Sequence, residues 1–156
     1  MNIVRNPKQI PPLLRMAMAA SLVASTACHA QLGSTFNAVA ISSDAVAHHA
    51  QGGLLNYRET TDANGIVVHQ YVDSSGTVYA VTWRGPAMPD VQSLLGTYFQ
   101  RFATGASASA GAVGLHAARV ADGDLVVENQ MRLREFSGRA WLVSALPAGV
   151  STADIQ

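Results

Sequence analysis

Residues 66–83, IVVHQYVDSSGTVYAVTW, predict a β-hairpin around which the rest of the fold can be placed. Its centre is acidic, serine-rich and ends in glycine, which is typical of a tight turn, and β-branched and aromatic residues flank it on both sides. If Val72 pairs with Thr77, Val68 lies opposite Val81. Side chains alternate along a strand, so one face then gathers the large apolar residues and should be buried. These residues are Ile66, Val68, Val72, Tyr79, Val81 and Trp83.

The segments on either side of the hairpin predict a further strand and a helix. Residues 54–60 read as a strand that leads into an Asn-Gly turn at Asn64. After the hairpin, Pro86 and Pro89 end the strand, and Asp90 can cap a helix start. Apolar residues then recur every three or four positions, which predicts an amphipathic helix over residues 91–103. We expect its apolar stripe to pack on the hairpin.

The segments outside this centre are less regular. Residues 31–51 form a poorly defined N-terminal segment, with a short helix predicted over 45–50. Residues 104–112 are rich in Ala, Ser and Gly, which predicts a flexible loop. Beyond it we expect strands over 113–120, 125–130 and 140–146 (the last alternatively a short helix), a turn at Ser137-Gly138 and a polar tail. The fold class is therefore α+β, an antiparallel β-meander sheet with one clear amphipathic helix packed on one face.

The first thirty residues have the pattern of a secretory signal peptide. A basic leader precedes an uncharged run over residues 16–27, and Cys28-His29-Ala30 ends it with small residues where a signal peptidase reads. We expect cleavage after Ala30 and export to the periplasm or cell envelope. The apolar run is shorter than the roughly 18 residues that a membrane-spanning helix needs. Lipidation at Cys28, which would make a lipoprotein, is the remaining alternative.

Cleavage would leave residues 31–156 as a single exported domain with an unusual composition. Seven arginines then face ten carboxylates, a net charge near −3, and neither lysine nor cysteine remains. A weakly acidic chain without basic clusters is unsuited to nucleic acid, and no phosphate-binding P-loop is possible without lysine. Such a domain is disulfide-free, so burial and hydrogen bonding must stabilise it. No cofactor is expected, and a protein of the envelope is the partner we consider.

Candidate site residues lie on the predicted hairpin. His69 and Tyr71 share one strand face, and Trp83 and Arg84 precede the helix start. We take these four as candidate ligand-binding residues. His69 can equally be a half-buried structural histidine, or the centre of a small hydrolase or metal-dependent enzyme together with Tyr71 or His116. No nucleophile motif or metal-ligand spacing is recognisable, so no catalytic or metal-binding residue is assigned.

A second group of charged residues surrounds Phe136. It consists of Arg132, Arg134, Glu135 and Arg139. These residues could bind an anionic partner, or they could keep an edge strand soluble, as charges on edge strands commonly do. We favour the second interpretation.

Several blocks of this sequence resemble an exported proteobacterial family known as domain of unknown function 2844. The resemblance rests on residues 69–86 together with four shorter blocks, and on Leu32-Gly33 directly after the predicted leader. The shorter blocks are residues 88–90, 94–99, 136–140 and 146–150. The resemblance implies export and a single domain, and it implies no activity, cofactor or catalytic residue. We therefore expect an exported, non-catalytic binding or accessory module.

Overall fold

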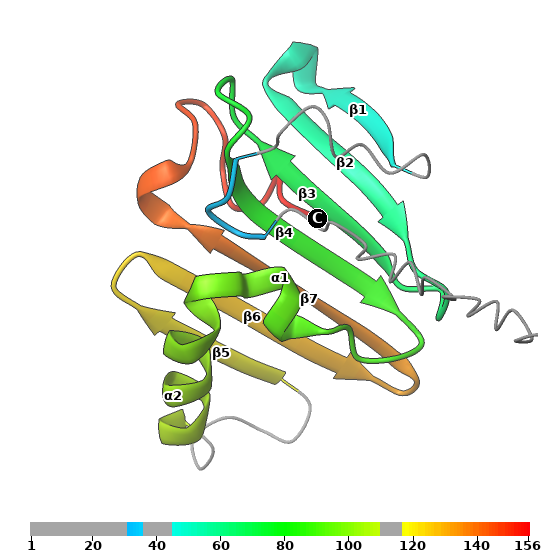
Figure 1. Ribbon diagram of the computed structural model, residues 1–156, viewed down its shortest axis with the longest axis vertical. Helices are drawn as coiled ribbons and strands as arrows, with labels where there is room; N and C mark the ends of the chain where they lie inside the picture. Colours follow the sequence, from blue (N-terminus) through cyan, green and yellow to red (C-terminus); the bar gives the residue numbers. More distant parts are fainter. Residues whose placement is uncertain (1–30, 36–44, 110–116) are drawn as a thin grey trace, which may run out of the picture.

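The computed structural model describes residues 31–35, 45–109 and 117–156. Within these ranges, seven strands form one antiparallel sheet in the order β1-β2-β3-β4-β7-β6-β5 (Figure 1). The strands are β1 (Val46–Ala50), β2 (Leu55–Thr61), β3 (Val67–Val72), β4 (Val78–Gly85), β5 (Ala117–Asp122), β6 (Leu125–Arg132) and β7 (Glu135–Leu142). The helical elements are η1 (Gln51–Gly53), α1 (Val91–Leu95), η2 (Gly96–Tyr98), α2 (Phe99–Ser109) and η3 (Val143–Ala145).

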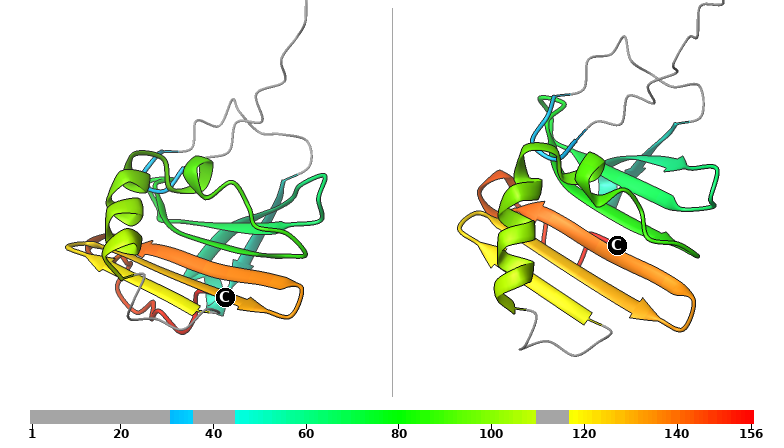
Figure 2. Two further views of the ribbon diagram at one scale, coloured as in Figure 1. Left: turned by 90° about the horizontal axis from the view of Figure 1, so that it is seen from below. Right: turned by 60° about the horizontal axis from the view of Figure 1, so that its bottom comes forward.

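The sheet consists of two meanders, β1 to β4 and β5 to β7, and the helical segment connects them. Because β4 pairs with β7, this segment carries the chain from the middle of the sheet to its far edge at β5. Figure 2 shows α1 and α2 on one face of the sheet and the C-terminal segment on the other. The predicted α+β class, with an antiparallel sheet and a helix packed on one face, is confirmed.

The helical segment begins where the sequence predicts, with the Asp90 carboxylate accepting the Ser93 amide at 3.1 Å. It bends at Gly96, which has φ +53° and ψ −123°, outside the helical region. A side chain at this φ would be strained, which explains glycine at position 96. The prediction of a loop over residues 104–112 is wrong for 104–109, which continue α2. Packing of α2 against β5, with Gly105 close to Val120, stabilises the helix despite the low helix propensity of the glycine and serines there.

The register of the β3–β4 hairpin differs from the predicted one by two residues. Val68 lies opposite Trp83 rather than Val81, and His69 lies opposite Thr82 rather than Ala80. One residue of the shift arises in the turn. The other arises at a β-bulge, where Tyr71 pairs with Ala80 and the next pair is Val72 with Val78. A shift of two residues preserves the face of a side chain, so Ile66, Val68, Val81 and Trp83 share the buried face as predicted.

Tyr79 is the exception, because the bulge turns it to the opposite face. There it joins Tyr71 and Ala80, while Val78 takes its predicted place beneath the helices. The prediction for Tyr79 was therefore wrong. No pattern in the sequence marks the extra residue.

The β6–β7 hairpin also corrects the sequence-based prediction. The chain turns at Leu133 and Arg134, since Arg132 pairs with Glu135, whereas Ser137 and Gly138 lie within β7. A Cβ on Gly138 would overlap the Trp83 ring, which explains a glycine in the middle of a strand. β6 and β7 are interior strands, so the charges around Phe136 do not protect an edge.

The described parts of the N-terminal segment, residues 31–35 and 45–51, contribute to the fold, and residues 36–44 lie outside the described residues. Residues 46–50, expected as a short helix, form the edge strand β1. Leu32 is 2% exposed, and its amide donates to the Leu94 carbonyl at 3.0 Å. Gly33 and Val78 are joined by a hydrogen bond of 2.8 Å between the Gly33 amide and the Val78 carbonyl. The chain directly after the predicted cleavage point is thus part of the core.

Both faces of the sheet bury apolar side chains. The helix-side core contains Leu32, Ile66, Val68, Val78, Val81, Trp83, Leu94, Leu95, Leu125, Val127, Ala140 and Leu142. The tail-side core contains Leu55, Tyr71, Tyr79, Ala80, Val126, Trp141 and Ile155. Ile155 is 0% exposed, so the C-terminal segment, expected as a polar tail, is a structural element that covers part of the second face.

Candidate functional site

A row of polar side chains crosses the tail side of the sheet. The strand registers place one residue from each of six neighbouring strands in line, from β2 to β5. This polar row consists of Glu59, His69, Thr82, Arg139, Glu128 and Arg119. Polar groups at the centre of a sheet must be paired to offset their desolvation, and most of these are.

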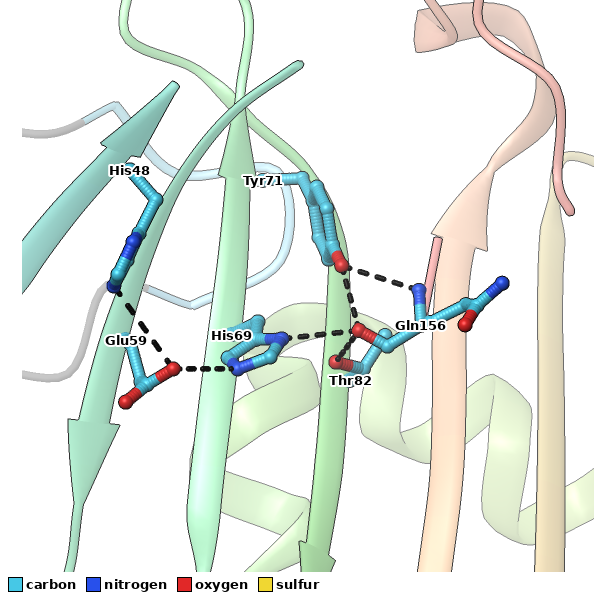
Figure 3. Close-up of polar contacts among 6 residues, drawn as sticks. All are labelled: His48, Glu59, His69, Tyr71, Thr82 and Gln156. Carbon is cyan, nitrogen blue, oxygen red and sulfur yellow. Dashed lines mark hydrogen bonds and ion pairs between the residues drawn. The ribbon is translucent and has the colours of Figure 1, made fainter. Parts of the chain in front are cut away.

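His69 lies between two oxygen atoms (Figure 3). Its Nε2 is 3.0 Å from Glu59 Oε2, and its Nδ1 is 3.0 Å from the main-chain oxygen of Gln156. Both ring nitrogens therefore have an oxygen partner within this chain. The Tyr57 ring packs beside the imidazole with 4.9 Å between ring centroids, and His48 stacks on the other side of Tyr57. The His69 ring is therefore fixed in orientation.

Three donors converge on the main-chain oxygen of Gln156. In addition to His69, the Tyr71 hydroxyl donates to it at 2.7 Å and the Thr82 hydroxyl at 3.2 Å. The Gln156 amide donates in return to the Tyr71 hydroxyl at 3.1 Å. Burial raises the pKa of Tyr71 above its usual value, which keeps this hydroxyl a donor. These three side chains form a binding site for an oxygen acceptor, and the main-chain oxygen of Gln156 occupies it.

Arg139, which lies two strands away from His69 in the polar row, also binds the C-terminal segment. Its Nη1 donates to the Thr152 carbonyl at 2.7 Å and to the Ile155 carbonyl at 3.4 Å. Its Nε and Nη2 are both 2.8 Å from Glu128 Oε2. The guanidinium also lies over the Trp141 ring, 5.2 Å from the centroid. This face of the sheet thus binds a turn-containing peptide segment through its main-chain oxygens and one buried aliphatic side chain, Ile155.

An open groove of ≈ 870 Å³ begins where this segment ends. Ile155 and Gln156 form one wall, and the floor continues over the polar row toward β5. Its charged lining residues among those described are three arginines and one glutamate, namely Arg84, Arg119, Arg139 and Glu128. Among the described lining residues positive charges therefore outnumber negative ones, although the residues after the predicted cleavage point carry a net negative charge.

The four predicted site residues separate into two pairs. His69 and Arg84 line the groove, with the Arg84 side chain 73% exposed and paired with Glu135. Tyr71 is 3% exposed and lies under Gln156. Trp83 contributes to the groove lining, but it is only 2% exposed and belongs to the helix-side core. His116 and Cys28 lie outside the described residues.

Neither a metal cluster nor a membrane-spanning helix occurs in the part of the chain that the structure describes. Within that part, no three His, Cys, Asp or Glu side chains are close enough together to bind a metal ion. Its helices are also too short or too polar to cross a bilayer.

The comparison with protein families decides the classification. The model of the family described as "Protein of unknown function (DUF2844)" matches residues 28–155. The chain belongs to this family. The match includes every described strand and helix and confirms the resemblance seen in the sequence blocks. No curated protein and no solved structure matches the chain. The DUF2844 description assigns no activity, so the role of the site is argued from its geometry.

Sequence reasoning missed most of the polar row. The predicted turn over residues 62–65 would place Glu59 opposite Val68, whereas Asp62 pairs with Ile66 in the structure and so brings Glu59 opposite His69. Arg139 and Glu128 became neighbours only once the turn at Leu133 was known. No sequence pattern indicated that Gln156 contacts the polar row, because a segment without hydrophobic periodicity does not show where it packs.

Proposed function

We propose that the protein is exported and acts in the periplasm or cell envelope as a non-catalytic binding module. Its binding surface is the sheet face that carries the polar row and the groove. The groove carries the proposal, because a cavity of ≈ 870 Å³ with a few convergent polar groups is within the size range of binding sites. The proposed partner is another component of the envelope.

The contacts of His69 favour binding over catalysis. A general base needs a nitrogen free to take a proton from a substrate. Both nitrogens of His69 are within 3.0 Å of oxygen atoms of this chain, Glu59 on one side and Gln156 on the other. Thr82, the hydroxyl across from His69, donates to the same oxygen of Gln156. These groups hold the C-terminal segment, so the hydrolase or metal-dependent alternative has no supporting contact here.

Two observations support export with cleavage after Ala30. The family match begins at residue 28, so the basic and apolar parts of the predicted leader lie outside the family region. Leu32, the second residue after the predicted cleavage point, is buried against the helix-side core. A cleavage point only a few residues later would remove a core side chain.

Fractionation and N-terminal sequencing test the export proposal. We expect the protein in the periplasmic or envelope fraction with Gln31 as its first residue. A chain that starts at Met1 in the cytoplasmic fraction would contradict export. A lipid-modified Cys28 at the N-terminus would replace simple cleavage with the lipoprotein alternative.

Affinity purification from envelope extracts tests the binding surface. The variant Arg84→Gln/Arg119→Gln removes two exposed charges of the groove. Arg134→Gln, in the exposed β6–β7 turn, is the control because Arg134 does not line the groove. We expect partners that are retained by the wild type and the control but lost by the double variant. Equal retention by all three proteins would exclude the groove as the binding surface.

A further inference from the structure

We propose that the groove binds an extended acidic peptide segment, with one carboxylate at Arg84 and a second at Arg119. This inference rests on the proposed function and names the ligand class for the same surface. Three observations support it: the C-terminal segment of this chain lies beside the groove, arginines predominate among the charged lining residues, and two of these arginines are exposed at a fixed spacing.

The C-terminal segment shows that this face accepts a peptide chain. Arg139 holds the Thr152 and Ile155 carbonyls, and His69, Tyr71 and Thr82 hold the main-chain oxygen of Gln156. These hydrogen bonds bind main-chain oxygens, and Ile155 adds one buried aliphatic side chain. Main-chain hydrogen bonds also provide much of the affinity when proteins bind extended peptides, with side-chain pockets adding specificity. Since Gln156 forms a wall of the groove, a second peptide would lie next to the first on the same floor.

The charges of the groove select an acidic ligand. Arg139 is engaged by Glu128 and the C-terminal segment. The other two arginines are held mainly by surface contacts. Arg119 is 3.5 Å from Glu128 and its side chain is 64% exposed, and Arg84 has an exposed side chain paired with Glu135. Exposed pairs of this kind contribute roughly 0–1 kcal/mol, so an incoming carboxylate can replace or share them.

The spacing of the arginines sets the spacing of the carboxylates. Arg84 lies on β4 and Arg119 on β5, with β7 and β6 between them. Three inter-strand spacings of about 4.8 Å separate the two strands by roughly 14 Å. Arg84 also lies two residues along β4 from Thr82, the residue in line with Arg119, so the two Cα atoms are roughly 16 Å apart. An extended peptide rises about 3.4 Å per residue, so residues i and i+4 lie roughly 14 Å apart on the same side, and the long arginine side chains can cover the remaining difference of about 2 Å. We expect acidic residues at positions i and i+4.

Fluorescence anisotropy with the purified protein tests this inference. The probe is a labelled, amidated seven-residue peptide of Ser and Thr with Glu at positions 2 and 6. Controls are the same peptide with Gln at both positions, a peptide with Glu at positions 2 and 3, and polygalacturonate as an acidic polysaccharide. We expect binding of the first peptide only. Binding should weaken about three- to fivefold with Arg84→Gln or Arg119→Gln, remain unchanged with Arg134→Gln, and fall as salt is raised.

The other outcomes overturn the inference. Equal binding of the Gln peptide would mean that the groove does not recognise negative charge. Equal binding of the peptide with adjacent Glu residues would reject the i and i+4 spacing of the carboxylates. Binding of polygalacturonate without the peptide would assign the groove to a polysaccharide. Absence of all binding would reject the ligand class. The proposed function as a binding module would still hold after that result if the double variant Arg84→Gln/Arg119→Gln no longer retained envelope partners in affinity purification. It would be rejected if the double variant retained them.

Discussion

Tyr71 and Gln156, 85 positions apart in sequence, exchange two hydrogen bonds: the Tyr71 hydroxyl donates to the main-chain oxygen at 2.7 Å and accepts from the amide at 3.1 Å. Tyr79, beside Tyr71 in the same core, is 0% exposed and its hydroxyl has no partner among the described residues. Two neighbouring buried tyrosines thus differ in the pairing of their hydroxyls. This pair provides a matched test of the tail-side core.

Replacing each tyrosine by phenylalanine should have opposite effects. Tyr71→Phe loses both hydrogen bonds to Gln156 and should lower the free energy of unfolding by about 1–2 kcal/mol. Tyr79→Phe removes a buried hydroxyl that is desolvated and unpaired, and should raise this free energy by about 1 kcal/mol. Urea denaturation of both variants measures the difference. Equal destabilisation by the two variants would show that the Tyr79 hydroxyl has a partner.

Alkaline pH should destabilise the protein through Tyr79. Burial raises the pKa of Tyr79 from 10.0 to about 12. Between these values the unfolded state has lost the phenolic proton and the folded state still holds it, so stability falls as pH rises. The slope should approach about 1.4 kcal/mol per pH unit from this group. Stability measured from pH 9 to 12 should show a shallower fall in Tyr79→Phe, and identical slopes would contradict the assignment.

The segment after the predicted cleavage point should contribute to stability. Leu32→Ala removes a side chain that is 2% exposed in the helix-side core and should cost about 2–5 kcal/mol. Leu54→Ala is the matched control, because Leu54 is 54% exposed and should cost less than about 1 kcal/mol. Thermal and urea unfolding measure both variants. A neutral Leu32→Ala would place the start of the domain later in the chain.

The C-terminal segment should behave as part of the fold. Ile155→Ala removes a fully buried side chain from the tail-side core and should cost about 2–5 kcal/mol. Hydrogen exchange at residues 152–156 should also become faster, because the main-chain contacts to Arg139 and Tyr71 would loosen. Val143→Ala, at a site that is 51% exposed, is the control. Unchanged stability and exchange in Ile155→Ala would show that the segment does not stabilise the sheet.

Glycine at position 138 should be essential to the packing of Trp83. A Cβ there would overlap both the Trp83 ring and Asn129 Oδ1. Gly138→Ala should therefore cost about 1–3 kcal/mol, the usual cost of overpacking a core. The tryptophan fluorescence of Trp83 should change with it. A variant with wild-type stability and an unchanged emission maximum would mean that the ring can move aside freely.

The sequence predicted the centre of this fold because local patterns there agree with the packing. The hairpin around residues 66–83 kept its buried face because the register error was an even number of residues. Helix length was underestimated because residues 104–109 resemble a linker in composition while packing as helix. The turn at Leu133 was missed because Leu133 has φ +56°, a conformation that leucine rarely adopts. Docking of Ile155 depends on long-range contacts that no local pattern encodes.

Site-specific photo-cross-linking in living cells tests the central claim that the tail-side face is the binding surface. A photoreactive residue at Gln130 would be exposed in the groove, and one at Gln100 would be exposed on α2, over the opposite face. We expect irradiation to give a discrete cross-linked product from position 130 and none from position 100. Products from position 100 alone, or equal products from both positions, would contradict it.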